Sequence, residues 1–143
     1  MNEILEAGEY APSGMGQQGT LMVVTQNPEL VAKLSKMNAD VMGTESDPFY
    51  GAPTVVVVFA DSNMPTCVEN GSLVMGNLMN AAHALGVDSC WIHRAREVFA
   101  SEEGKALKAE WGCAGVLCLE LVIVCLVIAP GNIRKRKREK TDL

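Results

Sequence analysis

The sequence is poor in the residues that usually form a metal centre or a disulfide framework. Its 143 residues include only two histidines and five cysteines, and no CxxC pair occurs. Because the cysteines are odd in number and lack zinc-type spacing, we expect neither a metal site nor a set of disulfides. The sequence predicts instead free, buried thiols in a reducing cytoplasm, at Cys67, Cys90, Cys113, Cys118 and Cys125.

The common catalytic and phosphate-binding motifs are also missing. There is no GxxxxGK loop and no Ser-His-Asp arrangement. No side chain is a convincing general acid or base, so we assign no catalytic residue. A site with so few titratable groups favours a bound cofactor that carries the reaction itself. Small and polar residues gather in three predicted loops, at 11–18, 47–53 and 89–95.

Positive charge is scarce over most of the chain. The net charge is −5, and eight of the twelve Lys and Arg residues follow Gly104. An acidic body argues against nucleic acid as a partner. The hydrophobic fraction of 48% and the charged fraction of 20% are typical of one globular domain. The acidic start, Met1 to Glu3, predicts no signal peptide.

One long apolar run, Val116–Ala129, precedes five consecutive cations at Arg134–Arg138. The run has 14 residues and contains Glu120, whereas a helix that spans a bilayer needs about 20 apolar residues. We therefore expect no membrane anchor. The β-branched content of the run predicts a buried strand.

Periodicity and capping residues predict alternating helices and strands. Asn27 and Pro28 are typical of a helix start, and the first helix has no N-cap residue. The helix Asn70–Leu85 is apolar nearly all round, which predicts burial or a subunit interface, with Asn70 as its cap and His83 as a satisfied structural histidine. The expected elements are helices at 4–10, 28–41, 70–85 and 101–111, and strands at 20–25, 54–60, 87–92 and in the apolar run.

Three stretches resemble the nitroreductase family, flavoproteins that bind FMN and take hydride from NADH or NADPH. They are EAGEYAPSGMGQQ at 6–18, PFYGAP at 48–53, and GSLVMGNL at 71–78 followed by AA, LG and SCWIHRA at 89–95. The resemblance covers Met1 to about Gly115, and both order and spacing fit. It implies an α/β (α+β layered), nitroreductase-like fold with a central mixed sheet flanked by helices, incomplete at both ends.

The resemblance also implies where the cofactor and the substrate would lie. A loop beside the isoalloxazine ring would be formed by Pro12, Ser13, Gly14 and nearby Gln18. A strand end would offer backbone N–H groups that stabilise charge on the reduced flavin, at Trp91, Ile92, His93 and Arg94. The substrate mouth would be lined by Phe49 and Tyr50. Gly16 stands where the family often has Asn.

For the whole protein, the resemblance implies a cytoplasmic homodimer with FMN sites built from both subunits and the helix 70–85 at its core. The expected function is hydride transfer from NADH or NADPH, through FMN, to a small-molecule acceptor such as a nitro compound or a quinone. The alternative is an inactive or degraded fragment, or a non-enzymatic binding module with a basic tail. Flavin absorbance of the purified protein distinguishes the two.

The chain departs from the family pattern at both ends. The family has an early Arg-Arg-Ser-x-Arg segment that grips the FMN phosphate, so residues 1–115 are interpreted as a nitroreductase-like domain that lacks its N-terminal segment. Residues 116–143 are interpreted as an aberrant tail. Codons permitted for Leu119–Leu143, read one base out of frame, can encode the family's Gly-Ile-Gly-His-Cys-Val-Leu-Gly-Tyr and a Lys-rich extension. We hypothesise a frame shift shortly before Leu119.

Overall fold

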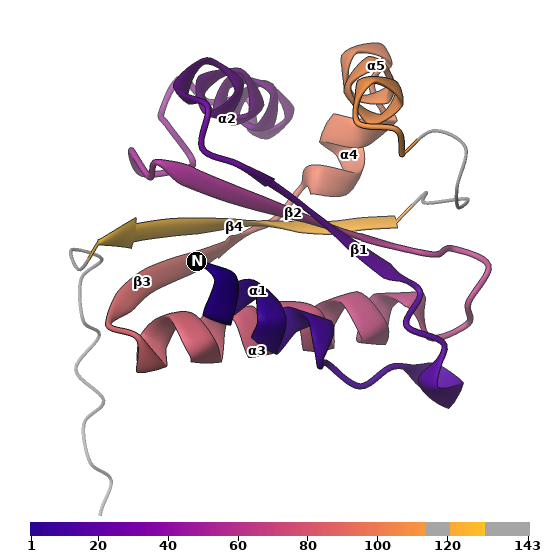
Figure 1. The fold of residues 1–143 in the computed structure, drawn as a ribbon. Coiled ribbons are helices and arrows are strands. Elements are labelled where there is room, and N and C mark those ends of the chain that lie inside the picture. The colour runs from indigo at the N-terminus through magenta and orange to yellow at the C-terminus, as the bar shows by residue number, and fades with distance from the viewer. Residues whose placement is uncertain (114–120, 131–143) are drawn as a thin grey trace, which may run out of the picture.

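The computed structural model describes residues 1–113 and 121–130. Helices and strands alternate through most of this part of the chain, as expected, and one short helix, α4, was not predicted (Figure 1). The elements in order are α1 (Asn2–Glu9), the 3-10 turn η1 (Gly14–Gly16), β1 (Thr20–Thr25), α2 (Pro28–Met42), β2 (Thr54–Ala60), α3 (Cys67–Ala84), β3 (Val87–Ile92), α4 (Ala95–Ala100), α5 (Glu102–Glu110) and β4 (Leu121–Pro130).

The four strands form one sheet in the order β1-β2-β4-β3. The family resemblance implies a mixed sheet, and the three pairings that the structure describes are all antiparallel. The reason is visible between β1 and β2, where Thr20 pairs with Ala60 and Thr25 pairs with Val55. Helix α2 is followed by the long segment 43–53, so the chain re-enters the sheet at the end where it left. Helix periodicity alone does not reveal that return.

The apolar run of the C-terminal region contributes a strand to this sheet. Strand β4 lies between β2 and β3, pairing Val57 with Cys125 and Trp91 with Leu126. The predicted strand is therefore confirmed over Leu121–Pro130, while the cations at 134–138 lie outside the described residues. The proposed domain boundary at 115 stays a prediction, and β4 belongs to the same sheet as the upstream strands. The described residues include no helix long and apolar enough to cross a membrane.

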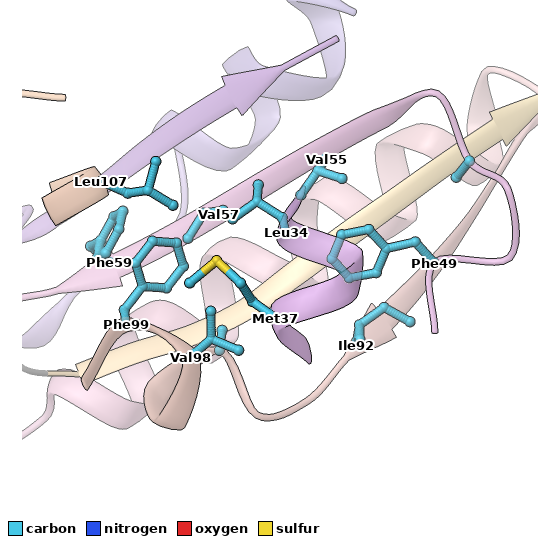
Figure 2. Close-up of a cluster of buried hydrophobic side chains, with 12 residues drawn as sticks. Leu34, Met37, Phe49, Val55, Val57, Phe59, Ile92, Val98, Phe99 and Leu107 are labelled. Atoms are coloured by element: carbon cyan, nitrogen blue, oxygen red, sulfur yellow. The ribbon is translucent and has the colours of Figure 1, made fainter. Parts of the chain in front are cut away.

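Helices cover both faces of the sheet, with α1 and α3 on one face and α2, α4 and α5 on the other (Figure 1). Every residue of β2 is buried, as the continuous apolar run predicts. Because side chains alternate along a strand, Val55, Val57 and Phe59 belong to one core cluster, shown in Figure 2, whereas Val56 and Val58 belong to the other. Burying each such side chain contributes about 1.5–3 kcal/mol.

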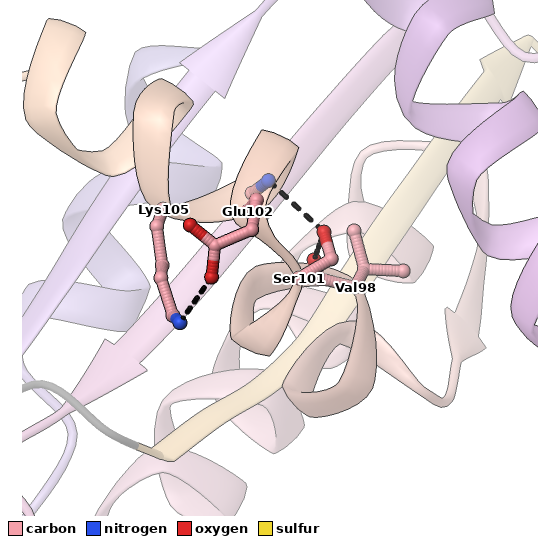
Figure 3. A network of polar contacts seen from close by, with 5 residues as sticks. Val98, Ser101, Glu102 and Lys105 are labelled. Carbon is pink, nitrogen blue, oxygen red and sulfur yellow. Dashed lines mark hydrogen bonds and ion pairs between the residues drawn. The ribbon is translucent and has the colours of Figure 1, made fainter.

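Side-chain caps mark the starts of α2 and α5. The Asn27 Oδ1 atom accepts the backbone N–H groups of Glu29 at 2.9 Å and Leu30 at 3.3 Å, which confirms the predicted start of α2. At α5, the Ser101 Oγ accepts the N–H of Gly104 at 3.1 Å and donates to the carbonyl of Val98 at 2.6 Å (Figure 3). These bonds join α4 closely to α5.

Aromatic rings hold the α4–α5 pair against the sheet. The ring centroids of Phe59 and Phe99 lie 5.3 Å apart, and those of Phe99 and Trp111 lie 5.6 Å apart. Both pairs are within the range of favourable aromatic contacts. The predicted helix at 101–111 is thus confirmed, packed through side chains that only the tertiary structure brings together.

Candidate functional site

The predicted flavin loop leaves α1 and makes a tight turn before β1. Met15 has φ 54°, Gly16 has φ 66° and Gln18 has φ 50°, so three nearby residues adopt the left-handed region, which is costly for residues with a side chain. The Ser13 Oγ accepts the backbone N–H of Gln18 at 2.8 Å. Pro12 and Gln18 are exposed, and Ser13 and Gly14 are partly buried. Four of the predicted residues therefore do lie on one turn.

A buried asparagine on α3 holds this loop. The Asn70 side chain is 2% exposed, and its Oδ1 accepts the backbone N–H of Gly14 at 2.9 Å. The prediction that Asn70 caps the helix is wrong, because α3 begins three residues earlier, at Cys67. The available signal was its position on the buried face with Val74 and Leu78, since a polar group on a buried face needs a partner.

The loop also approaches α3 closely at a glycine. A Cβ atom on Gly14 would lie 2.2 Å from the Oγ1 of Thr66. A larger residue at this position would require the Thr66 side chain to rotate or the loop to move. His83, which we predicted to be a satisfied structural histidine, lies exposed at the other end of α3.

The second group of predicted residues lines a cavity of about 410 Å³ at the end of β3. The structure here brings together the predicted strand end with Tyr50 and with residues of α2 and the following segment. Trp91 is 38% exposed, Ile92 is buried, and His93 and Arg94 are exposed. The lining residues are Met42, Ser46, Asp47, Pro48, Tyr50, Cys90, Trp91, Ile92, His93 and Arg94.

Asp47 fixes the segment that faces this strand end. Its Oδ1 accepts the Ser35 hydroxyl at 2.5 Å and the N–H of Phe49 at 2.8 Å, and its Oδ2 accepts the N–H of Gly51 at 2.6 Å. Burial acts to raise the pKa of Asp47, but the three hydrogen bonds outweigh it and lower the pKa below its ordinary value. The carboxylate is therefore ionised and occupied at neutral pH, which does not suit a general acid.

The two aromatic residues of this segment have different roles. Phe49 is 1% exposed, lies in the core cluster of Figure 2 and does not line the cavity at the end of β3, so its role at a substrate mouth stays a prediction. Tyr50, with φ 55°, is 71% exposed and lines the cavity. Asp47 and the turn direct the Phe49 ring into the core and the Tyr50 ring toward solvent. Two adjacent aromatic residues in a sequence do not show which of them is buried.

The cavity also contains a thiol. Burial raises the pKa of Cys90, so the sulfur is protonated at neutral pH and is a poor nucleophile. Cys67, Cys90 and Cys113 are free, while the side chains of the other two cysteines lie outside the described residues. The described residues contain no cluster of three His, Cys, Asp or Glu side chains suited to a metal ion.

Sequence reasoning also missed Asn38, on α2. Its side chain is 1% exposed and its Nδ2 donates to the backbone carbonyl of His93 at 2.9 Å. A second, larger cavity of about 800 Å³ was likewise not predicted, between α2 and the segment 44–53. It shares Ser46 and Asp47 with the smaller cavity and includes none of the residues Trp91–Arg94.

The two predicted groups do not meet within one chain. The 12–18 loop packs on the start of α3, on one side of the sheet, and Asn38 holds the strand end from the opposite side (Figure 1). The cavity lined by Trp91–Arg94 includes none of the loop residues.

Solved structures share this fold at low sequence identity. A nitroreductase from Bacteroides fragilis, crystallised with bound FMN, has a TM-score of 0.78 and 22% identity, covering 99% of this chain and 83% of its own. An FMN-dependent nitroreductase from Clostridium difficile has a TM-score of 0.77 and 24% identity, covering 99% and 80%. An iodotyrosine deiodinase bound to FMN and 3-iodo-L-tyrosine has a TM-score of 0.72 and 20% identity, covering 99% and 83%.

At these identities the structures establish the fold alone, and no curated protein sequence matches the chain. The family assignment depends on a separate finding. The model of the nitroreductase family matches residues 42–129, more than half of the chain and including most of β4. This protein therefore belongs to the nitroreductase family.

Proposed function

We propose that this chain is an FMN-dependent oxidoreductase that takes hydride from NADH or NADPH and reduces a nitro compound, a quinone or a similar small acceptor. The observation that carries the proposal is the cavity at the end of β3. Its one carboxylate, Asp47, is occupied by three hydrogen bonds, and its thiol, Cys90, is protonated. A lining of this kind can bind and orient a ligand, and a cofactor supplies the redox chemistry.

The residues present fit a flavin in their chemistry. A volume of about 410 Å³ falls in the range of small-molecule sites, and Trp91 and Tyr50 expose aromatic surface suited to a flat ring system. When bound, FMN supplies the capacity to accept a hydride and pass it on. On this proposal the cofactor is held by Trp91, Ile92, His93 and Arg94 on one side and by Pro12, Ser13, Gly14 and Gln18 on the other.

A homodimer accounts for the separation of these two groups. We propose that the loop of one protomer meets the strand end of its partner, so that each FMN lies between two chains. Helix α3 supports this arrangement because Val68 and Leu73 expose apolar side chains along it, at 51% and 45%, as an uncovered interface would. The free thiols of the described cysteines suit the reducing cytoplasm.

The protein's own groups have three tasks in this mechanism. Backbone N–H groups of the strand end stabilise negative charge on the reduced cofactor. Tyr50, at the mouth, positions the acceptor and limits the entry of water. Asp47 keeps that mouth in place through its bonds to the N–H groups of Phe49 and Gly51.

The test is an absorbance spectrum of the full chain purified with added FMN, followed by oxidation of NADH and NADPH with a nitroaromatic or quinone acceptor. We expect bound flavin, turnover and a dimer by sedimentation. Trp91→Ala is expected to weaken FMN binding about tenfold by removing aromatic contact, while Val41→Ala, an exposed apolar change on α2, leaves it unaltered. Colourless protein without flavin affinity would instead support the non-enzymatic alternative.

A further inference from the structure

The buried side chain of Asn38 has one polar atom with a hydrogen-bond partner and one without. Its amide Nδ2 donates to the carbonyl of His93 at 2.9 Å. Its Oδ1 is buried and has no hydrogen-bond partner in the part of the chain that the structure describes. Leaving such an acceptor unpaired costs about 1–3 kcal/mol. A leucine of similar size would avoid that cost, so the structural gain from the amide is its bond to His93.

That bond fixes the peptide unit between His93 and Arg94. In a trans peptide the C=O and the following N–H point in opposite directions. With the His93 carbonyl directed toward Asn38 and the core, the N–H of Arg94 points away from it. Asn38 does not line the cavity, whereas His93 and Arg94 both do. The amide of α2 thereby determines which way a backbone donor of the strand end faces.

The backbone at this point requires such a constraint. Arg94 has φ 75° and ψ 8°, in the left-handed region, and it is the N-cap of α4 without a side-chain cap. For a residue with a side chain this conformation costs on the order of 1–2 kcal/mol, and it persists only where surrounding contacts impose it. On the α4 side, the Arg94 carbonyl accepts the N–H of Val98 at 3.1 Å. Asn38 constrains the turn from the β3 side.

We propose that Asn38 is a positioning residue of the cofactor site, which holds the His93–Arg94 turn so that the Arg94 N–H is presented to the electron-rich edge of a reduced flavin. The proposal rests on the proposed function, in that the ligand of the turn is FMN. Asn38 itself touches no reacting atom. Its contribution is the orientation of a donor that exists only if the strained turn is kept.

The chain offers a matched control at Asn77, on α3. Its Nδ2 also donates to a backbone carbonyl, that of Ala7, at 2.9 Å. Asn38→Leu and Asn77→Leu therefore remove the same kind of bond on opposite sides of the sheet. Asn38→Ser removes the bond to His93 with a smaller side chain, and it replaces Asn38→Leu if that variant does not fold.

The first measurement is amide hydrogen exchange in the full chain without ligand. We expect the N–H groups of Val98 and of the next α4 residues, 99 and 100, to exchange on the order of tenfold faster in Asn38→Leu, as the loss of one buried hydrogen bond implies. In Asn77→Leu the exchange of this segment should equal that of the unaltered chain. Equal rates in all three proteins, or equal acceleration in both variants, would overturn the proposal.

The second measurement separates positioning from simple structural support. It compares the affinities of oxidised and reduced FMN, and hence the flavin midpoint potential. Asn38→Leu should lose about tenfold more affinity for the reduced form, because a donor to its negative charge is misplaced; Asn77→Leu should not. Equal loss for both redox forms would reduce Asn38 to a structural role. Absence of FMN binding by the unaltered chain would refute the proposed function, while the exchange rates still decide whether Asn38 holds the turn.

Discussion

Two helical glycines should respond to the same substitution with opposite signs. A Cβ atom on Gly104, in α5, would lie 2.2 Å from the carbonyl oxygen of Val98 and 2.5 Å from the Cα of Phe99. A Cβ atom on Gly76, in α3, would meet nothing within 4 Å. Alanine is favoured over glycine in helices by about 1 kcal/mol. Gly104→Ala is therefore expected to destabilise the protein, and Gly76→Ala to stabilise it.

The size of the Gly104 effect follows from what must move. The opposing atoms belong to the backbone of α4, so no side chain can rotate away, and the two helices must separate by about 1 Å to restore ordinary contact. The separation strains both bonds of Ser101, to Gly104 and Val98, each of which contributes about 1 kcal/mol. With an overpacking cost of about 1–3 kcal/mol and the helix gain deducted, the expected loss is about 3 kcal/mol.

Thermal unfolding followed by circular dichroism measures both variants at one protein concentration. The expected change is a fall of roughly 10 °C in Tm for Gly104→Ala and a rise of a few degrees for Gly76→Ala. A Gly104→Ala protein whose Tm lies within about 2 °C of that of the unaltered chain would refute the close packing of α4 against α5. The added methyl group would meet backbone atoms of Val98 and Phe99, which cannot rotate away.

Three further predictions concern the candidate site. Asn70→Leu removes the bond to the Gly14 N–H, so the 12–18 loop should be cleaved faster in limited proteolysis and FMN affinity should fall about tenfold; unchanged cleavage would contradict the role of Asn70. Phe49→Ala should lower the free energy of unfolding in urea by about 3–5 kcal/mol, because it truncates a core side chain. Tyr50→Ala should leave stability nearly unchanged and raise the KM for the acceptor. The reverse pattern would instead indicate that Phe49 lines the substrate mouth. Asp47 has a lowered pKa, so its contribution is complete above the unfolded-state pKa of about 4 and is lost as pH falls through the folded pKa. Asp47→Asn should therefore lower stability by less than about 1 kcal/mol at pH 7 and make no difference near pH 2, as measured by urea unfolding across that range.

Two observations concern the C-terminal region of the chain. The in-frame residues of β4 form a strand of the sheet, and the family match extends to residue 129. Any run of β-branched apolar residues suits a strand between two neighbours, so this placement does not depend on which reading frame the gene once had. The frame-shift hypothesis before Leu119 stays a prediction, and sequencing the gene and its transcript tests it.

Local chemistry was enough to predict most elements from the sequence. The bounds of β1, β2 and β3 agree with the predicted strands, because alternation and continuous apolar runs report directly on burial. The Asn27 cap and the Ser101 start of α5 were likewise readable, since a cap acts on the next few residues along the chain. The family motifs at 6–18, 48–53 and 71–95 were visible for the same reason, as continuous stretches.

Contacts between distant residues were decided only by the tertiary structure. Sequence pattern could not show that Asn70 and Asn38 would each hold a turn more than fifty residues away. It could not separate buried Phe49 from exposed Tyr50, because a turn of unknown φ divides them. Nor could it fix the antiparallel order of the sheet, since strand direction depends on where each connection returns. Sequence determined which segments form helices and strands, and packing determined which polar groups position the candidate site.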